Sequence, residues 1–172
     1  TFFASTNPVV EAELGDTASV ELGLAFTTSV VGEIRAIRYY KGAGSSGVHV
    51  GSLWDQSGNR LAQVTFTNET ASGWQRAALS TPVVIGPGQT YTVSYLAPSG
   101  RYAYSPATLT NEVSSGPLKT IAAQNGLSRY GTGGAAPTST YNSTNYFADL
   151  EFVVQSTLAV SNPAPARGGH NL

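Results

Sequence analysis

RYYKGAGSSGVHVGSLWDQSGNRLAQVTFTNETASGW, residues 38–74, contains two strand-like segments with a polar turn between them. Residues 49–54 form the first segment, and residues 61–67 form the second. The sequence DQSGN at 55–59 supplies the polar residues and the glycine that a tight turn requires. This stretch therefore predicts a β-hairpin, and β-hairpins are the building unit of antiparallel sheets.

The same stretch carries specialised side chains on its predicted loops and strand ends. They are Lys41, His49, Trp54, Glu69 and Trp74. Loops held by a rigid scaffold are where binding groups tend to lie. The stretch therefore indicates recognition as well as fold.

Short apolar runs recur along the rest of the chain, separated by Gly, Pro, Ser and Asn. Alternation at 20–26 predicts a half-buried strand, and in 34–40 it places Ile37 and Tyr39 inward, with Arg38 and Tyr40 on the opposite face. We expect further strands at 74–79, 83–85, 91–95, 101–104 and 146–154, and a long loop through RYGTGGAAPTSTYNSTN. The spacing of Leu118, Ile121 and Ala122 predicts one short helix.

Short strands with hardly any helix predict an all-β protein in which two antiparallel sheets pack face to face as a β-sandwich. We prefer a jelly roll to an immunoglobulin-like connection. Residues 1–155 are predicted to form a single domain, since 172 residues suffice for one continuous core. Residues 156–172 contain NPAPARGGHNL and have the composition of a linker or tail.

Composition excludes several classes of function. Nine basic and 10 acidic residues give a net charge of −1, so the chain lacks the positive charge that nucleic-acid binding requires. No apolar run approaches the roughly 20 residues of a membrane span. The absence of Cys and Met excludes disulfides and thiol chemistry and suits an exported bacterial protein. Because the chain begins at Thr1 without a signal-peptide pattern, we expect a mature or excised soluble piece.

Several strings of residues resemble the signature blocks of a bacterial domain-of-unknown-function family, the one numbered four thousand and eighty-two. They occur in family order over about residues 16–154 and are VELGLAF, IRAIRYYKGAGSSGVHVGSLWDQSG, FTNETASGWQ, PVVIGPGQTYTVSYLAPSGRYAY, NGLSRYG and NYFADLEF. The resemblance implies an extracellular module beside immunoglobulin-like repeats, glycan-active enzymes or other surface domains, with no established activity. Tyr39 stands where that family usually has Phe, and Phe147 where it usually has Trp.

Catalytic patterns are weak in this sequence. His49 and His170 are the only histidines, and no GxSxG motif accompanies them, which argues against a hydrolase triad. A glycosidase needs two carboxyl groups at a defined separation, and the spacing of Asp55, Glu69 and Asp149 singles out no pair. We therefore expect a protein that is not an enzyme.

Sugar recognition requires flat aromatic faces and polar groups that pair with hydroxyls. The sequence offers both types of group at predicted loops and strand ends. The predicted ligand-binding residues are Lys41, His49, Trp54, Arg101, Tyr104, Asn125, Arg129 and Tyr130.

Each of these residues also has a structural interpretation. A buried, hydrogen-bonded His49 is at least as well supported as a ligand contact, and a core position for Trp54 is about as well supported as an exposed one. Arg129 and Tyr130, between Gly126 and Gly131, suit either loop anchoring or a ligand clamp. Tyr91, Tyr95 and Tyr102 are predicted to be core residues, whereas Tyr40, Tyr104 and Tyr141 are predicted to reach solvent.

A structural calcium ion is the one cofactor that the carboxylates suggest, because Ca²⁺ prefers oxygen ligands. The candidate ligands are Asp16, Glu69 and Asp149, although no DxDxDG run is present. Helix capping or a solvated surface position is the alternative for each of these acids.

The sequence thus favours a noncatalytic carbohydrate-binding module of a secreted or cell-surface bacterial protein that recognises a neutral polysaccharide. Its expected partners are a surface glycan and the neighbouring domains of a larger exported protein, with no nucleic acid. A structural or adhesive spacer is the second hypothesis, and a glycan-active enzyme is a distant third.

Overall fold

The computed structural model describes residues 1–156 and consists of strands and loops, with no helix in that range. Most of the predicted runs that alternate hydrophobic and polar residues become strands, because alternation lets one face bury its side chains. The strands are β1 (Val20–Thr28), β2 (Gly32–Lys41), β3 (Val50–Trp54), β4 (Arg60–Thr65), β5 (Gly73–Ile85), β6 (Tyr91–Ala97), β7 (Ser114–Ser115), β8 (Leu118–Thr120), β9 (Gly126–Tyr130), β10 (Ser139–Thr140) and β11 (Ala148–Val154).

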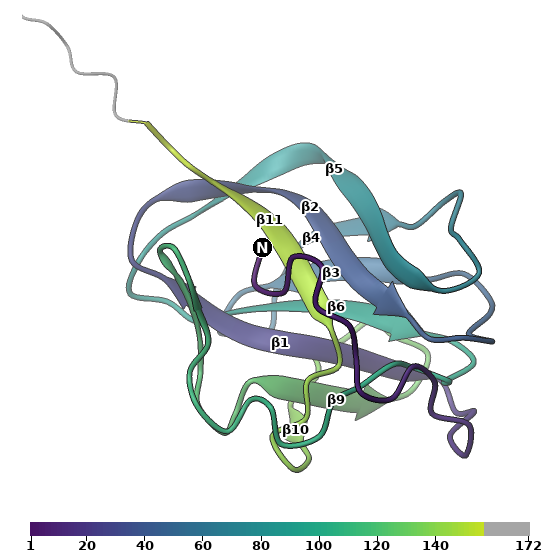
Figure 1. Ribbon diagram of the computed structural model, residues 1–172. Coiled ribbons are helices and arrows are strands. Elements are labelled where there is room, and N and C mark those ends of the chain that lie inside the picture. The colour runs from purple at the N-terminus through teal and green to yellow at the C-terminus, as the bar shows by residue number, and fades with distance from the viewer. Residues whose placement is uncertain (157–172) are drawn as a thin grey trace, which may run out of the picture.

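The strands form two sheets that pack face to face (Figure 1). The large sheet has the order β10-β9-β1-β6-β3-β4, with β8 paired to β1 and β7 paired to β8. The small sheet has the order β11-β2-β5. All pairings between these strands are antiparallel. The predicted all-β sandwich is confirmed, and the jelly-roll connection stays a prediction.

The predicted hairpin is confirmed as β3 and β4, whose register joins Val50 to Thr65. Asp55 shapes the turn between them, since its Oδ1 accepts hydrogen bonds of 2.9 Å from the amides of Ser57 and Asn59. The two predicted strands at 74–79 and 83–85 merge into the single strand β5. The β2–β5 register shifts between them, because Ile34 pairs with Val83 whereas Ala36 pairs with Ala78.

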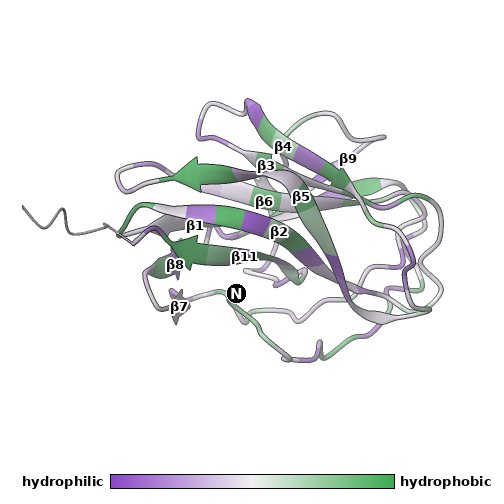
Figure 2. Ribbon diagram, turned by 90° about the horizontal axis from the view of Figure 1, so that it is seen from above, coloured by the Kyte–Doolittle hydropathy of each residue, from purple (hydrophilic) through white to green (hydrophobic). Residues whose placement is uncertain are grey.

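The core lies between the sheets and is built from the inward residues of both. Figure 2 shows the two layers and the hydrophobic and hydrophilic segments that follow one another along several strands. Ile37 and Tyr39 are buried there, as predicted, and Tyr39 stacks on Tyr95 with ring centroids 4.4 Å apart. Stacked aromatic pairs of this kind add to the free energy that burial alone supplies.

β1 differs from its prediction because both of its faces are buried. Val20 and Leu22 face the core. On the other face, a Cβ added to Gly23 would lie 2.9 Å from the Pro137 side chain, so the loop before β10 closely covers β1. The prediction of a half-buried strand was therefore wrong, since a distant loop supplies a second cover.

The outer face of the small sheet also carries packed aromatic residues. Tyr40 was predicted to reach solvent, but it is buried. Its ring meets the Trp74 ring edge-on at 5.7 Å and the Phe147 ring at 6.3 Å. The Arg38 guanidinium lies 4.5 Å from the centre of the Trp74 ring, a cation–π contact.

The N-terminal segment explains why this face is covered. It runs beside β11 (Figure 1), and the Phe3 ring lies 5.6 Å from the Phe147 ring. The amides of Phe2 and Phe3 donate hydrogen bonds of 2.8 and 3.3 Å to the Asp149 carboxylate. Farther along, Val10 and Tyr104 form an isolated antiparallel bridge.

Two local predictions were wrong. The predicted short helix near Leu118 is the strand β8, because Leu118 and Thr120 are buried on one face and pair with the end of β1. The predicted strand at 101–104 is an irregular segment, with Arg101 at φ 52° and a single bridge at Tyr104. The predicted tail lies outside the described residues from 157 onward. Within residues 1–156 there is no helix long and apolar enough to cross a membrane.

Candidate functional site

An aromatic groove lies at the side of the sandwich where the large sheet extends beyond the small one. The edge strand of the small sheet, β11, packs against β6 and β1. β9 and β10 continue the large sheet past that edge. Tyr130 pairs with Val20 and Ser128 with Leu22, and cross-strand partners share a face of a sheet. Tyr130 and Ser128 therefore continue the inner face into an uncovered region.

Two adjoining hollows occupy this region, with volumes of about 340 and about 230 Å³. Tyr102, Tyr141 and Tyr146 line both of them. Val20, Leu22, Ser128 and Tyr130 complete the first, and Glu13, Tyr104, Pro106 and Thr144 complete the second. We call the site formed by Tyr102, Tyr104, Tyr130, Tyr141 and Tyr146 the tyrosine groove.

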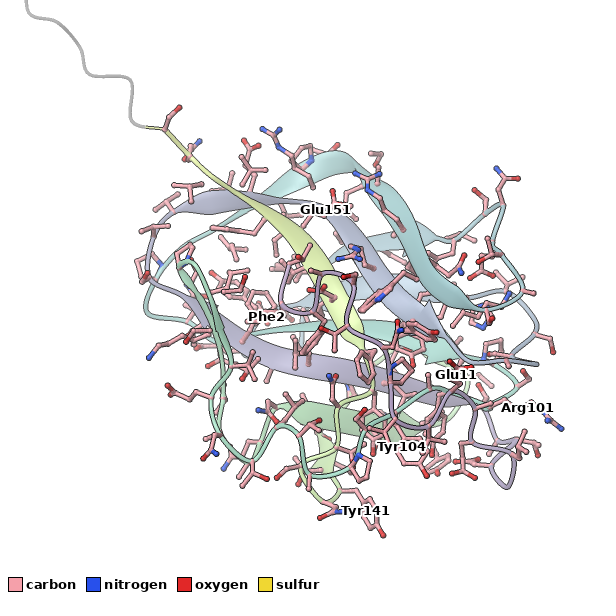
Figure 3. The ribbon with its side chains drawn as sticks, in the orientation of Figure 1. Phe2, Glu11, Arg101, Tyr104, Tyr141 and Glu151 are labelled. Carbon is pink, nitrogen blue, oxygen red and sulfur yellow. The ribbon has the colours of Figure 1, made fainter. Side chains whose placement is uncertain are left out.

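The five tyrosines come from three parts of the chain. Tyr102 and Tyr104 follow β6, and their ring centroids are 6.0 Å apart. The Tyr146 ring, just before β11, meets the Tyr102 ring edge-on at 5.6 Å. Tyr130 and Tyr141 are the most open members, with 62% and 72% of their surface exposed. Figure 3 shows Tyr104 and Tyr141 on the same side of the molecule.

Asp16 orders the hydroxyl groups at one end of the groove. Its Oδ2 accepts hydrogen bonds from the hydroxyls of Tyr130 at 2.6 Å and Tyr102 at 3.1 Å. The hydrogen bond to Asp16 raises the pKa of Tyr130, and burial raises the pKa of Tyr102. Both phenols therefore stay protonated at neutral pH and present neutral polar edges.

His49 and Lys41 lie elsewhere, in a cluster with Tyr39, Ser45 and Glu69 that we call the histidine cluster. His49 Nδ1 is 2.9 Å from Glu69 Oε2, and His49 Nε2 is 3.0 Å from Ser45 Oγ. Tyr39 donates a hydrogen bond to the same carboxylate, and Lys41 Nζ is 3.5 Å from it. Burial lowers the pKa of His49, which favours the neutral ring.

The order Ser45, His49, Glu69 matches the order of bonds in a serine hydrolase triad. The imidazole of His49 is 0% exposed, however, and Ser45 is only 7% exposed. A triad histidine must exchange a proton with the substrate, and His49 has no exposed surface at which to do so. The cluster instead anchors the glycine-rich loop GAGSSG at residues 42–47, because Ser45 Oγ also lies 3.2 Å from the Gly100 carbonyl.

Trp54 and Asn125, two further predicted ligand-binding residues, are also buried. Trp54 donates a hydrogen bond of 2.7 Å to Ser94. Asn125 donates a hydrogen bond of 2.9 Å to the Leu109 carbonyl, and this bond connects two loops. His49, Trp54 and Asn125 are therefore corrected to structural positions, since their polar atoms already have partners within the protein.

The structure places the remaining predicted residues as follows. Tyr104 and Tyr130 line the tyrosine groove, so these two are brought together. Arg129 is exposed on β9, on the opposite face from Tyr130. Arg101 lies beside the glycine-rich loop, near Gly44. Arg129 and Tyr130 belong to a strand, which corrects their predicted loop position.

The three predicted calcium ligands lie in three separate bonding groups. Asp16 accepts bonds from tyrosines, Glu69 belongs to the histidine cluster, and Asp149 pairs with Arg38 at 3.2 Å. Among the described residues, no group of three or more His, Asp or Glu side chains is placed to hold a metal ion. The structure therefore does not bring Asp16, Glu69 and Asp149 together as a calcium site.

Three groove residues, Tyr102, Tyr141 and Tyr146, are absent from the predicted ligand-binding residues. Tyr102 was assigned to the core because it alternates with Tyr104, yet its ring is only partly buried and forms a groove wall. The prediction that Tyr141 reaches solvent is confirmed. The residues next to it in the sequence do not indicate that it lies beside the other groove tyrosines. Only the density of tyrosines between 102 and 146 signalled an aromatic site.

Comparison with protein families matches residues 5–148 to the family described as "Domain of unknown function (DUF4082)". The chain belongs to the DUF4082 family. The match includes all members of the tyrosine groove and of the histidine cluster. It confirms the family expected from the sequence motifs. A search of curated proteins finds no match.

Proposed function

We propose that this DUF4082 domain is a noncatalytic carbohydrate-binding module that recognises a neutral polysaccharide through the tyrosine groove. The observation that carries the proposal is the convergence of five tyrosines from three chain segments on two adjoining hollows. Under this proposal the domain is part of a secreted or cell-surface bacterial protein, and it keeps the neighbouring domains of that protein close to a glycan.

The chemistry of the groove supports a sugar ligand. Aromatic faces pack against the apolar faces of pyranose rings, while phenol hydroxyls pair with sugar hydroxyls. Tyr130 and Tyr141 offer the most open rings for this purpose. Among residues 1–156, no Lys or Arg lines either hollow. A neutral ligand fits this lining better than a polyanion, because a polyanion would find no cation there to balance its charge.

The carboxylates near the groove support binding rather than glycoside cleavage. Asp16 Oδ2 is held by two tyrosine hydroxyls, and its Oδ1 accepts a hydrogen bond of 3.0 Å from the Ala18 amide. Glu13 Oε1 accepts a hydrogen bond of 2.9 Å from the Gly15 amide. Both acids are thus engaged in shaping the N-terminal segment and the groove wall.

Affinity electrophoresis and pull-down on a panel of soluble and insoluble neutral polysaccharides test this proposal. We expect saturable binding that Tyr104→Ala and Tyr141→Ala each weaken by about tenfold, since loss of a stacking ring costs on the order of 1.5 kcal/mol. Val84→Thr, at an exposed position on β5, is the matched control and should bind like the wild type.

Lys41→Ala separates the groove from the loop set predicted from sequence. Because Lys41 is largely covered and pairs with Glu69, the groove model expects unchanged affinity for this variant. Absence of binding to every polysaccharide would contradict the proposal and favour a structural or adhesive spacer. Binding that Lys41→Ala abolishes and the tyrosine variants leave intact would place the site elsewhere.

A further inference from the structure

Glu21 and Arg129 face each other across β1 and β9 without forming an ion pair. They are directly opposite in the antiparallel register and share the outer face of the large sheet. Arg38 and Asp149 occupy the same kind of cross-strand position in the small sheet and do form an ion pair, at 3.2 Å. No such bond joins Glu21 to Arg129 among the described residues.

Glu21 and Arg129 both line a small hollow. Its volume is about 150 Å³, and it is lined by Glu21, Arg129, Tyr130, Gly131, Gly133 and Ala135. Gly131 is fixed by a hydrogen bond of 3.0 Å from its amide to the Ser19 carbonyl. Gly133 has φ 89° and would place a Cβ 3.6 Å from Glu21 Oε2, so a side chain at this position would narrow the hollow. We call this site the Glu21 pocket.

One carboxylate oxygen of Glu21 is hydrogen-bonded within the protein, and the other is not. Only 3% of the residue is exposed. Ser94 donates a hydrogen bond of 2.5 Å to Oε1, and Trp54 donates 2.7 Å to Ser94. None of the described residues donates to Oε2, and no buried polar side-chain atom among them lacks a partner. Oε2 therefore reaches the hollow, where it can accept a hydrogen bond from a ligand.

We propose that Glu21 and Arg129 bind a vicinal diol of a sugar, with Glu21 Oε2 accepting from one hydroxyl and the Arg129 guanidinium donating to its neighbour. A diol is neutral, and each of its hydroxyls can donate or accept a hydrogen bond. It therefore suits a carboxylate that accepts and a guanidinium that donates on the same face of the sheet. This inference rests on the proposed function for its ligand class. Glu21 and Arg129 lie on the opposite face of the large sheet from the tyrosine groove, and Tyr130 lines both sites. The pocket is therefore a second contact next to the groove.

The charged groups around Glu21 shape its response to pH. Arg60 on β4 and Arg129 on β9 are the cations near it, while Ser94 and Trp54 are its neutral partners on β6 and β3. Burial raises the pKa of Glu21 to about 7 despite the opposing effects of Ser94 and Arg60. Because the ionised form is the better acceptor, sugar binding should lower this pKa.

The indole N–H of Trp54 is the reporter for the test, because it is linked to Glu21 through Ser94. The chain has two tryptophans, and the Trp74 indole donates to the Thr6 carbonyl, so the Trp74 signal is an internal control. Two-dimensional ¹H–¹⁵N spectra are recorded while glucose, galactose or mannose is added near neutral pH. A fully O-methylated glucoside, which lacks donor hydroxyls, is the control ligand.

We expect at least one free sugar to shift the Trp54 signal in a saturable way and to lower the pH midpoint of that signal. The response should be lost in Glu21→Gln and reduced at least fivefold in affinity in Arg129→Gln, whose exposed position leaves the fold intact. Tyr141→Ala should keep it. The O-methylated sugar should produce no shift.

Three results would overturn the inference. If polysaccharides bind through the tyrosine groove but no free sugar moves the Trp54 signal, the Glu21 pocket is not a sugar site and the proposed function stands. If the Trp54 response survives in both Glu21→Gln and Arg129→Gln, the sugar acts elsewhere. If neither polysaccharides nor free sugars bind, the proposed function fails as well.

Discussion

Burial controls the protonation of Glu21, and protonation links it to stability. The pKa of this carboxyl rises from 4.5 to about 7 on folding. The folded state therefore favours the neutral acid. The stabilisation that Glu21 contributes through this raised pKa is complete below pH 4.5 and is lost as the pH rises through about 7. A shift of this size corresponds to on the order of 3 kcal/mol.

We predict that Glu21→Gln removes this dependence. The variant's free energy of unfolding relative to the wild type should increase by on the order of 3 kcal/mol as the pH rises from below 4.5 to above 7. Urea denaturation at several pH values measures the difference. His49 has a lowered pKa and acts in the opposite sense, but its effect is common to both proteins and cancels. A constant difference would contradict the role of Glu21.

The histidine cluster makes a second prediction at this scale. His49→Ala leaves a cavity and removes a partner from both Ser45 and Glu69, so it should lower the free energy of unfolding by roughly 3 kcal/mol. Tyr39→Phe removes a single hydroxyl and should cost only about 1 kcal/mol. Thermal and urea unfolding measure both. Equal costs for the two variants would argue against His49 as the centre of the cluster.

At the scale of elements, the N-terminal segment depends on one acid in β11. Asp149 accepts hydrogen bonds from the amides of Phe2, Phe3 and Leu150 and pairs with Arg38. The segment has no strand of its own before β1, so its place beside β11 depends on these bonds and on aromatic packing. Its order should therefore respond to the single residue Asp149.

We predict that Asp149→Ala speeds hydrogen exchange at the Phe2 and Phe3 amides and lowers the free energy of unfolding by about 3 kcal/mol, because a buried partner of Arg38 is lost. Glu33→Gln is the control, since the Arg35–Glu33 pair is largely exposed and should contribute less than about 1 kcal/mol. Unchanged exchange at Phe2 in Asp149→Ala would show that aromatic packing alone holds the segment.

At the scale of the whole molecule, the two sheets share one core, and each contains one tryptophan. Trp54 lies on β3 in the large sheet, and Trp74 lies on β5 in the small sheet. A single core predicts cooperative, two-state unfolding. The single-tryptophan variants Trp54→Phe and Trp74→Phe should each give one fluorescence transition that coincides with the circular dichroism transition of the same protein. Separate fluorescence and dichroism midpoints in either variant would show that the sheets unfold independently.

The strands and their inward residues could largely be predicted because alternation is a local property. The β3–β4 hairpin and the inward positions of Ile37 and Tyr39 follow from a few neighbouring residues and a polar turn. The β8 segment could not be predicted in this way, because its spacing suits a helical turn equally well. Pairing with the far end of β1 decides that it is a strand.

The candidate site was harder to predict, because burial and convergence are properties of the whole fold. Tyr104 and Tyr130 could be identified by residue type, whereas Tyr102, Tyr141 and Tyr146 were not among the predicted ligand-binding residues. His49 and Trp54 have the chemistry of ligand contacts, but packing of distant segments buries them. Nothing local distinguishes a tyrosine on an open edge from one in the core.

The amino-acid sequence by itself determined the all-β class, the family and the neutral, tyrosine-rich character of the chain, because these depend on local pattern and composition. Only the tertiary structure decided where the large sheet outreaches the small one. That difference in width leaves the inner face of β9 uncovered and draws tyrosines from three segments into one groove. It also set Glu21 opposite Arg129 without a bond, since register and loop packing are fixed only when the sheets assemble.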